Sequence, residues 1–208
     1  MGAGGRRLQV PRRRRRPRRR GGALRARGDF LRVELAVREA RGDDAARIAH
    51  VHRESWRTTY GGILPADFIE QRAGRRSEEM WRWRLARPEP MAATWLAESD
   101  GKLLGFASCG PARHLLEGLE AEIYSLYVLQ AHQRAGVGRG LVRACAAHFV
   151  RHGVFGFYLW VLKANRARLF YEALGGEEMG EKSERLGRFS FVEVAYGWHD
   201  LTRLVAVK

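Results

Sequence analysis

Hydrophobic and polar positions follow two different periods along the chain after residue 30. Alternation with a period of two, in β-branched and aromatic residues, predicts strands, whereas apolar residues three and four positions apart predict amphipathic helices. Alternation occurs at Leu31–Arg38, and mainly apolar runs, which also suit strands, occur at Ala93–Glu98, Leu103–Cys109, Ile123–Leu129, Phe157–Leu162 and Phe189–Trp198. The second and third of these segments flank Asp100-Gly101, which indicates a tight β-hairpin.

Five helices are expected between these strands. Asp43 caps the first, Pro65 starts the second, and Ser77 starts the third. The fourth follows a glycine-rich turn, and the short fifth ends at Gly175-Gly176. A strand that follows the fourth helix should lie parallel to the strand before it. The apolar faces of the five helices contain Ala45, Ile48, Ala49, His52 and Trp56; Phe68 and Ile69; Met80, Trp81 and Leu85; Val137, Leu141, Val142, Cys145 and Phe149; and Ala167, Phe170, Tyr171 and Leu174.

The positive charge is concentrated at the start of the 208 residues. Of the formal net charge of +15, residues 1–30 carry twelve arginines and one acid, or +11, which leaves 26 basic and 22 acidic residues, or +4, for residues 31–208. Residues 1–30 have too few apolar groups to fold and are expected to be disordered. They are either a basic arm for nucleic acid or an anionic membrane, or upstream sequence translated from a start codon assigned too early. The second alternative is favoured, because no aromatic residue before Phe30 is present to stack on bases.

The rest of the chain fits one domain over residues 31–208, since 45% of the residues are apolar. No apolar run is long enough to span a membrane. Cys109 and Cys145 provide no disulfide framework, so a reducing cytoplasm is the expected location. His148 and His152 lie one helical turn apart but do not enclose the Glu-x-x of a zinc protease. A solvated helix face is expected there, and no metal is expected.

The most informative segment is the glycine-rich turn Gln133-Arg-Ala-Gly-Val-Gly138, between the strand Ile123–Leu129 and the fourth helix. Glycines let the backbone approach a ligand, and the free N–H groups at a helix start attract anions, so a diphosphate is the expected guest. Two glycines at this spacing have little structural purpose without a ligand. A dinucleotide fingerprint would need a glycine at Leu141, and a nucleotide P-loop would need Ser or Thr after Gly-Lys, where the chain has Leu103.

The turn Gln133–Gly138 resembles the coenzyme A loop of the GNAT superfamily of N-acetyltransferases, whose pattern is Gln/Arg-x-x-Gly-x-Gly/Ala. Two further segments share the resemblance. Val161–Gly176 carries Asn165 and, six residues later, Tyr171, and Ser55–Tyr60 precedes Gly61-Gly62-Ile-Leu-Pro65. The resemblance covers about residues 31–202 of the chain.

The resemblance implies the GNAT acyltransferase fold. This is an α/β domain with a mixed, mostly antiparallel central sheet of six to seven strands, flanked by about four helices, with the two motif strands parallel and splayed. It implies an N-acetyltransferase that transfers an acetyl group from acetyl-CoA to a primary amine. Direct attack in a ternary complex is expected, because neither Cys109 nor Cys145 has a base beside it that would mark a covalent intermediate. A coenzyme A-binding module without catalysis and a nucleic-acid-binding protein that uses its basic tail are the alternatives.

The resemblance also implies roles for individual residues. Glu122 corresponds to the general base, with Glu120 or water as alternatives, and Tyr171 to the general acid that protonates the departing thiolate. Backbone N–H groups of the strand before the loop are expected to face the oxyanion. Asn165 is expected to hold the pantetheine arm or to position Tyr171. The residues expected to contact coenzyme A are Leu126, Tyr127, Val128, Gln133, Arg134, Ala135, Gly136, Val137, Gly138, Arg139, Asn165 and Tyr171.

Trp56 and Tyr60 are expected to wall the acceptor pocket. Packing in the core is the alternative for both, and helical phase favours it for Trp56 while leaving Tyr60 open. The sequence does not distinguish a peptide terminus, a lysine, a polyamine, an amino acid or an antibiotic as the acceptor. Terminal strands often join subunits in this superfamily, so a homodimer is the assembly that the resemblance suggests.

Overall fold

The computed structural model describes residues 35–74, 76–186 and 189–206, together with Met1. Within these ranges the chain forms a seven-stranded sheet in the order β1-β2-β3-β4-β5-β7-β6. Neighbouring strands are antiparallel except β4 and β5, which are parallel and pair at a single position, Glu122 opposite Tyr158. The sheet therefore has two halves that diverge beyond this pair. The strands are β1 (Ala36–Glu39), β2 (Ala93–Ser99), β3 (Lys102–Leu116), β4 (Leu119–Val128), β5 (Phe157–Leu162), β6 (Glu177–Leu186) and β7 (Phe189–Trp198).

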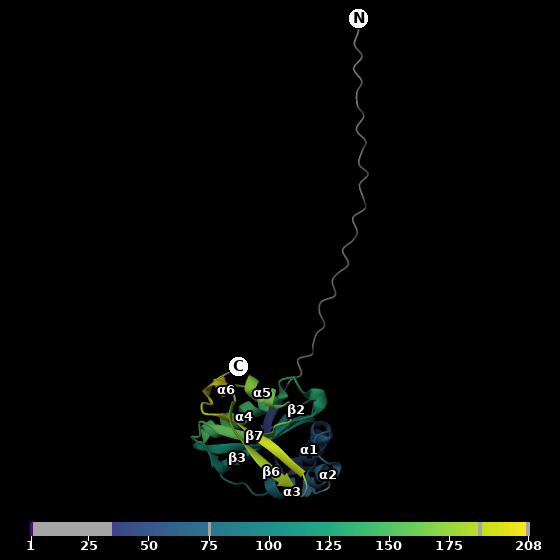
Figure 1. Cartoon of the computed structure of the whole chain (residues 1–208), viewed down its shortest axis with the longest axis vertical. Coiled ribbons are helices and arrows are strands. Elements are labelled where there is room, and N and C mark those ends of the chain that lie inside the picture. Colours follow the sequence, from purple (N-terminus) through teal and green to yellow (C-terminus); the bar gives the residue numbers. More distant parts are fainter. Residues whose placement is uncertain (2–34, 75, 187–188, 207–208) are drawn as a thin grey trace. The chain divides into compact units, whose positions relative to one another are not determined.

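Helices cover both faces of this sheet. Figure 1 shows α1, α2 and α3 grouped on one side, and α4 and α6 grouped on the other. Short 3-10 turns at Gly42–Asp44 and Gln130–His132 precede α1 and the loop before α4. The helices are α1 (Ala45–Tyr60), α2 (Ala66–Ala73), α3 (Ser77–Leu85), α4 (Val137–Arg151), α5 (Arg168–Ala173) and α6 (Thr202–Ala206).

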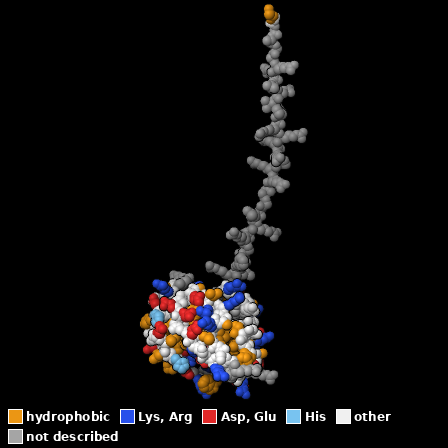
Figure 2. All heavy atoms as spheres, viewed as in Figure 1, with side chains coloured by type: hydrophobic (Ala, Val, Ile, Leu, Met, Phe, Trp, Pro, Cys, Tyr) orange, Lys and Arg blue, Asp and Glu red, His pale blue; other side chains and the backbone are white. Residues whose placement is uncertain are grey.

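Two hydrophobic cores lie on the two faces, because successive residues of a strand point to opposite sides. Phe106 of β3 packs with Ile48 and Trp81 in the core under α1 and α3, whereas Ala107 packs in the core that contains Leu141 of α4. The predicted apolar face of the fourth helix is thus confirmed. Figure 2 shows acidic and basic side chains interspersed over the visible face of the folded part, in keeping with its small net charge.

Two tight turns set the central hairpins. The predicted turn at Asp100-Gly101 is confirmed, with φ of 49° and 73°, and a second turn at Glu117-Gly118 has φ of 49° and 80°. Positive φ at both central residues is the geometry that joins right-twisted strands. The second turn was not predicted, so β3 is longer than expected and reaches Leu116.

The start of α1 differs from its prediction. Asp44, not Asp43, is the N-cap residue of α1, and its side chain makes no hydrogen bond to that helix but accepts one from the Arg41 N–H at 2.9 Å. Its carboxylate also pairs with Arg38 at 2.7 Å, and Arg38 pairs with Glu98 of β2 at 2.8 Å. The hydrogen bond from Arg38 lowers the pKa of Asp44 to about 2. This cluster fixes the first turn of α1 to the edge of the sheet.

The predicted fold class is confirmed, and the differences from the prediction concern single elements and residues. The first strand spans only Ala36–Glu39, and residues 31–34 of the predicted segment lie outside the described residues, as does the boundary proposed near residue 30. Met80 is exposed rather than on the apolar face of α3. His148 is buried against Trp95, with ring centroids 5.8 Å apart, so a solvated face was wrong for this residue. Neither β6 nor α6 was predicted from periodicity.

Candidate active site

A cleft of about 1410 Å³ opens where β4 and β5 diverge. Its walls come from α1, β4, the loop before α4, β5, α5 and the β6–β7 hairpin. The fold therefore brings together segments that are far apart in the sequence. Of the predicted site residues, those that line the cleft are Trp56, Tyr60, Glu122, Leu126, Tyr127, Val128, Gln133, Arg134, Gly136, Gly138, Arg139, Asn165 and Tyr171.

The loop between β4 and α4 has the geometry of an anion site. The value of φ is positive at Arg134 (61°) and at Gly136 (84°) but not at Ala135 between them, an alternation that turns successive N–H groups toward one point. The side chain of Gln133 closes the loop by donating from Nε2 to the Val128 carbonyl oxygen at 3.2 Å. The first hydrogen bond of α4 runs from the Gly140 N–H to the Gly136 carbonyl oxygen at 3.0 Å. The preceding N–H groups have no acceptor within the helix.

The two glycines of this loop have different purposes. A side chain at Gly136 would meet no protein atom within 4 Å, so the residue is required for its positive φ. A Cβ at Gly138 would lie 3.1 Å from the ring of Phe170 in α5. Gly138 thus also has a packing role, which corrects the expectation that both glycines serve only a ligand. Ala135 is exposed and Val137 is 2% exposed in the core, and neither lines the cleft.

A β-bulge in β4 decides which side chains face the cleft. Ser108 of β3 pairs with Ser125, and Cys109 pairs with Ile123, so Tyr124 is left without a partner across the hairpin. In a regular strand Glu122 and Tyr127 would point to opposite faces, because they are five residues apart. The extra residue brings both to the face covered by α1. Both line the cleft.

Glu122 is buried and surrounded by donors. Its side chain is 1% exposed. Oε2 accepts hydrogen bonds from the Arg113 backbone N–H at 3.1 Å, from Arg113 Nε at 3.0 Å and from the Tyr158 hydroxyl at 3.3 Å, and Oε1 accepts one from the second guanidinium nitrogen of Arg113. This pairing raises the pKa of Arg113. The rival base Glu120 is exposed and lies outside the cleft lining.

Three tyrosine side chains meet beside the start of α5. Burial raises the pKa of Tyr171, and the neighbouring Tyr60 raises it further, so Tyr171 keeps its proton at neutral pH. Burial also raises the pKa of Tyr60, although hydrogen bonds with Tyr127 and Asn165 oppose the shift. Asn165 Oδ1 in addition accepts a hydrogen bond from the Ala167 N–H at 2.9 Å, which fixes the first turn of α5. Tyr171 and Asn165 both line the cleft, and the roles expected for them stay predictions.

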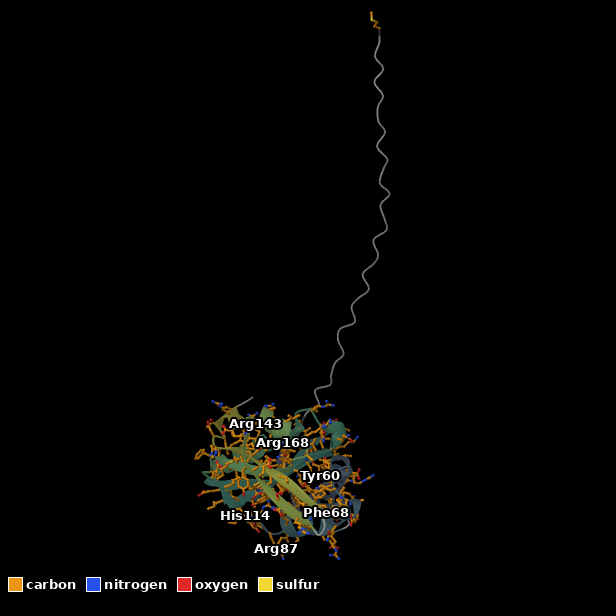
Figure 3. The ribbon with its side chains drawn as sticks, in the orientation of Figure 1. Tyr60, Phe68, Arg87, His114, Arg143 and Arg168 are labelled. Atoms are coloured by element: carbon orange, nitrogen blue, oxygen red, sulfur yellow. The ribbon has the colours of Figure 1, made fainter. Side chains whose placement is uncertain are left out.

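The opposite wall is aromatic. Trp56 is half-buried rather than in the core, and its ring lies 4.9 Å from Tyr60 and 6.1 Å from Phe68, measured between centroids. Figure 3 shows Tyr60 and Phe68 near each other on the side of α1 and α2. His52 packs behind Trp56 at 5.6 Å, and burial lowers its pKa to about 4. Both predicted wall residues therefore border the cleft.

Arg113 and Tyr158 were missed by sequence reasoning. Arg113 lines the cleft, and the Tyr158 hydroxyl holds the Glu122 carboxylate. The turn at Glu117-Gly118 was the sequence signal that could have identified Arg113, because this turn folds Arg113 back toward Glu122 across the hairpin. No sequence signal distinguishes Tyr158 from its apolar neighbours in β5. Among the described residues, no group of three or more His, Cys, Asp and Glu side chains is placed to hold a metal ion.

Comparison with known proteins identifies the domain type. Residues 45–175 match the model of the acetyltransferase (GNAT) family. The chain is 35% identical over 171 residues to YuaI of Bacillus subtilis, described as an uncharacterized N-acetyltransferase, and the match covers 82% of this chain and 96% of YuaI.

Solved structures show the same fold. The PaiA N-acetyltransferase from Thermoplasma acidophilum, determined in complex with coenzyme A, matches with a TM-score of 0.61 at 21% identity and covers 77% of this chain and 97% of its own. YncA from Salmonella typhimurium, determined with its cofactor acetyl-CoA, matches with a TM-score of 0.61 at 22% identity over 80% of this chain and 94% of its own. Within the described part of the chain, no helix has the length and apolar character needed to cross a membrane.

Proposed function

This chain belongs to the acetyltransferase (GNAT) family, and from that premise we propose that it transfers an acetyl group from acetyl-CoA to a primary amine by direct attack in a ternary complex. The observation that carries the proposal is the cleft between β4 and β5, which joins an anion-binding loop at one end to a buried carboxylate and an aromatic wall at the other. Donor and acceptor can therefore meet in one cavity. A homodimer and a reducing cytoplasm remain part of the proposal, and the free cysteines Cys109 and Cys145 are compatible with the latter.

The residues present fit coenzyme A. The unpaired N–H groups at the start of α4 suit a diphosphate. Arg134, Arg139 and Arg166 also line the cleft and can pair with further phosphate charge. We assign Asn165 and the backbone of Leu126–Val128 to the pantetheine arm and the thioester. When bound, acetyl-CoA supplies the activated acetyl group.

The chain's own groups would move the protons. An acceptor ammonium must lose a proton before it can attack, and we assign that step to Glu122. Tyr171 keeps its proton at neutral pH, so it is in the form that can protonate the thiolate of coenzyme A. The acceptor nitrogen loses two protons in all. One matches the proton that the coenzyme A thiol gains, and the other goes to solvent. Backbone N–H groups of β4 are assigned to the carbonyl oxygen.

Two other functions have less support. A coenzyme A-binding module without catalysis would have no need for both Asn165 and Tyr171 in the lining of the cleft. Nucleic-acid binding through the basic tail depends on residues 1–30, of which all but Met1 lie outside the described residues.

The experiment is a thiol-release assay of the full chain with acetyl-CoA and a panel of peptide termini, lysine derivatives, polyamines, amino acids and amino-sugar antibiotics. We expect at least one amine to release coenzyme A and to gain the mass of one acetyl group. Binding of acetyl-CoA without acetylation of any class would favour the inactive module. A chain that starts at Phe30 tests the role of the basic tail in nucleic-acid binding. Binding that persists undiminished without residues 1–29 would not be due to the tail.

A further inference from the structure

The proposed base is not free to act in this structure. Glu122 Oε2 already accepts three hydrogen bonds and Oε1 accepts one, all within a site where the carboxylate is 1% exposed. An acceptor amine can reach this carboxylate only if a donor leaves. Tyr158 is fully buried, and its one hydroxyl proton is shared between the His114 carbonyl oxygen at 2.6 Å and Glu122 Oε2 at 3.3 Å, so the hydroxyl is held on two sides. The Arg113 side chain is 60% exposed and is the donor that can move.

The backbone around Arg113 is anchored independently of its guanidinium. Regular pairing of β3 with β4 stops at Pro111 opposite Ala121 and resumes only at Leu116 opposite Leu119. The intervening arc, residues 112–115, which His114 marks in Figure 3, is held by the Arg113 N–H on Glu122 and by the Tyr158 hydroxyl on the His114 carbonyl oxygen. Departure of the guanidinium would leave both of these bonds in place.

A second cation, Arg84, lies near the pair of Glu122 and Arg113. The guanidinium carbon of Arg113 lies 5.1 Å from the centroid of the Tyr124 ring, and that of Arg84 lies 5.0 Å from the same centroid. Among the residues that the structure describes, Arg84 forms no ion pair. Burial lowers the pKa of Arg84, and the nearby Tyr124 and Glu89 offset this only in part. A partly buried cation without a directly paired counterion is costly, and an anionic ligand would offset that cost.

We propose that Arg113, with Arg84 behind Tyr124, recognises a carboxylate on the acceptor, and that its transfer from Glu122 to that carboxylate frees Glu122 to take the proton of the adjacent amine. Glu122 occupies the fork of Arg113 as the acceptor carboxylate would, with two parallel hydrogen bonds. Because guanidinium and carboxylate are in direct contact, the amine and the anionic group of the acceptor must be close neighbours, as in an α-amino acid. This substrate class rests on the proposed acetyl transfer.

The first test compares the common amino acids with the corresponding amino acid amides in the thiol-release assay, using the wild-type chain and Arg113→Gln. We expect the wild type to prefer amino acids, and Arg113→Gln to raise the KM for them by roughly tenfold to a hundredfold while the KM for amides changes little, since each lost charge-assisted bond has about that effect. Arg84→Gln should reduce the same preference by a smaller factor. Arg82→Gln is the control, because Arg82 lies on the same helix as Arg84 but is 64% exposed and pairs with Glu78.

The outcome that overturns the inference is equal turnover of amino acids and amides by the wild type, or a loss in Arg113→Gln that is the same for both classes. If Arg113→Gln does not fold, Arg113→Lys keeps the charge without the fork and should show the same selective rise in KM. A thermal-shift measurement in the presence of coenzyme A separates this inference from the proposed function. Amino acids that stabilise the wild type but not Arg113→Gln support carboxylate recognition even if no amine is acetylated, and amino acids that stabilise neither count against it.

Discussion

The two ends of the cleft are built in different ways. The end that we assign to the donor is made mainly of backbone, with unpaired N–H groups presented by a loop whose shape depends on positive φ at Arg134 and Gly136. The end that we assign to the acceptor is made of side chains, with a carboxylate held by Arg113 and Tyr158 and a wall that includes Trp56 and Tyr60. A backbone site can bind the same coenzyme in many proteins, whereas a side-chain site can change its substrate through single substitutions. Variants that affect one end and not the other test this division.

The largest effect is expected from Gly136→Val. A β-branched residue is strained at φ of 84°, so the loop should turn its N–H groups away from the diphosphate. Loss of two charge-assisted hydrogen bonds would weaken coenzyme A binding by roughly a thousandfold, or about 4 kcal/mol. Isothermal titration calorimetry with coenzyme A measures the change.

Gly153→Val is the matched control for this variant. Gly153 lies just beyond the C-terminal end of α4, has φ of 77° and, like Gly136, has no protein atom within 4 Å of a built Cβ. Both substitutions should lower the free energy of unfolding by a similar amount, about 1–2 kcal/mol, but only Gly136→Val should lose coenzyme A. Equal loss of binding in both would show that the loop has no special role.

The second effect concerns Tyr171, which we assign as the general acid. Tyr171→Phe should lower kcat by roughly a hundredfold, because the thiolate would lose its proton donor, and should leave coenzyme A affinity unchanged. Since the pKa of Tyr171 is raised above its ordinary value, the wild-type rate should show no decline from Tyr171 ionisation up to about pH 10. Steady-state kinetics across pH measure both quantities.

Tyr196→Phe is the control for Tyr171. The two rings lie 6.0 Å apart, but the Tyr196 hydroxyl donates to Glu172 at 2.6 Å and accepts from Arg168 at 3.0 Å, outside the cleft lining. This variant should lose about 1 kcal/mol of stability and keep its kcat. A Tyr171→Phe variant with wild-type kcat would remove Tyr171 as the acid and leave water in that role.

The third effect concerns His52, which packs behind the acceptor wall. Burial lowers its pKa to about 4, below the value of about 6.5 in the unfolded chain. Between these values the unfolded chain binds a proton that the folded chain does not, so stability is full above pH 6.5 and falls as the pH decreases toward 4. From pH 7 to pH 5 the free energy of unfolding should fall by about 2 kcal/mol from this residue. Urea unfolding at the two pH values measures the fall.

His52→Gln should remove most of this pH dependence, and His50→Gln should keep it, because His50 is exposed on the same helix. Some dependence should persist in His52→Gln, since burial also lowers the pKa of His148 on α4. If His52→Gln falls as steeply as the wild type, acid destabilisation arises outside the acceptor wall.

The same division explains what could be predicted from the sequence. Helix and strand periods and the glycine at a positive φ are local properties, so most helices and strands and the position of the loop before α4 followed from short segments, whereas the fold was implied by the resemblance. The partners of Glu122 are not local. They depend on the turn at Glu117-Gly118 and on the bulge at Tyr124, which together decide that Arg113 reaches the carboxylate. Glu122 was therefore found through a resemblance, whereas Arg113 was not found at all.

The smallest effect tests where the two ends meet. Tyr60 comes from the acceptor wall, yet Tyr127 of β4 and Asn165, which we assign to the donor, lower the pKa of its hydroxyl against the effect of burial. Tyr60→Phe removes only that hydroxyl and should cost about 1 kcal/mol, a change of roughly fivefold. If Tyr60 serves the acceptor, the KM of the amine rises and the Kd of coenzyme A does not. A change confined to the Kd of coenzyme A would instead place Tyr60 with the donor. In that case the C-terminal end of α1 would belong to the donor site and not to the acceptor wall.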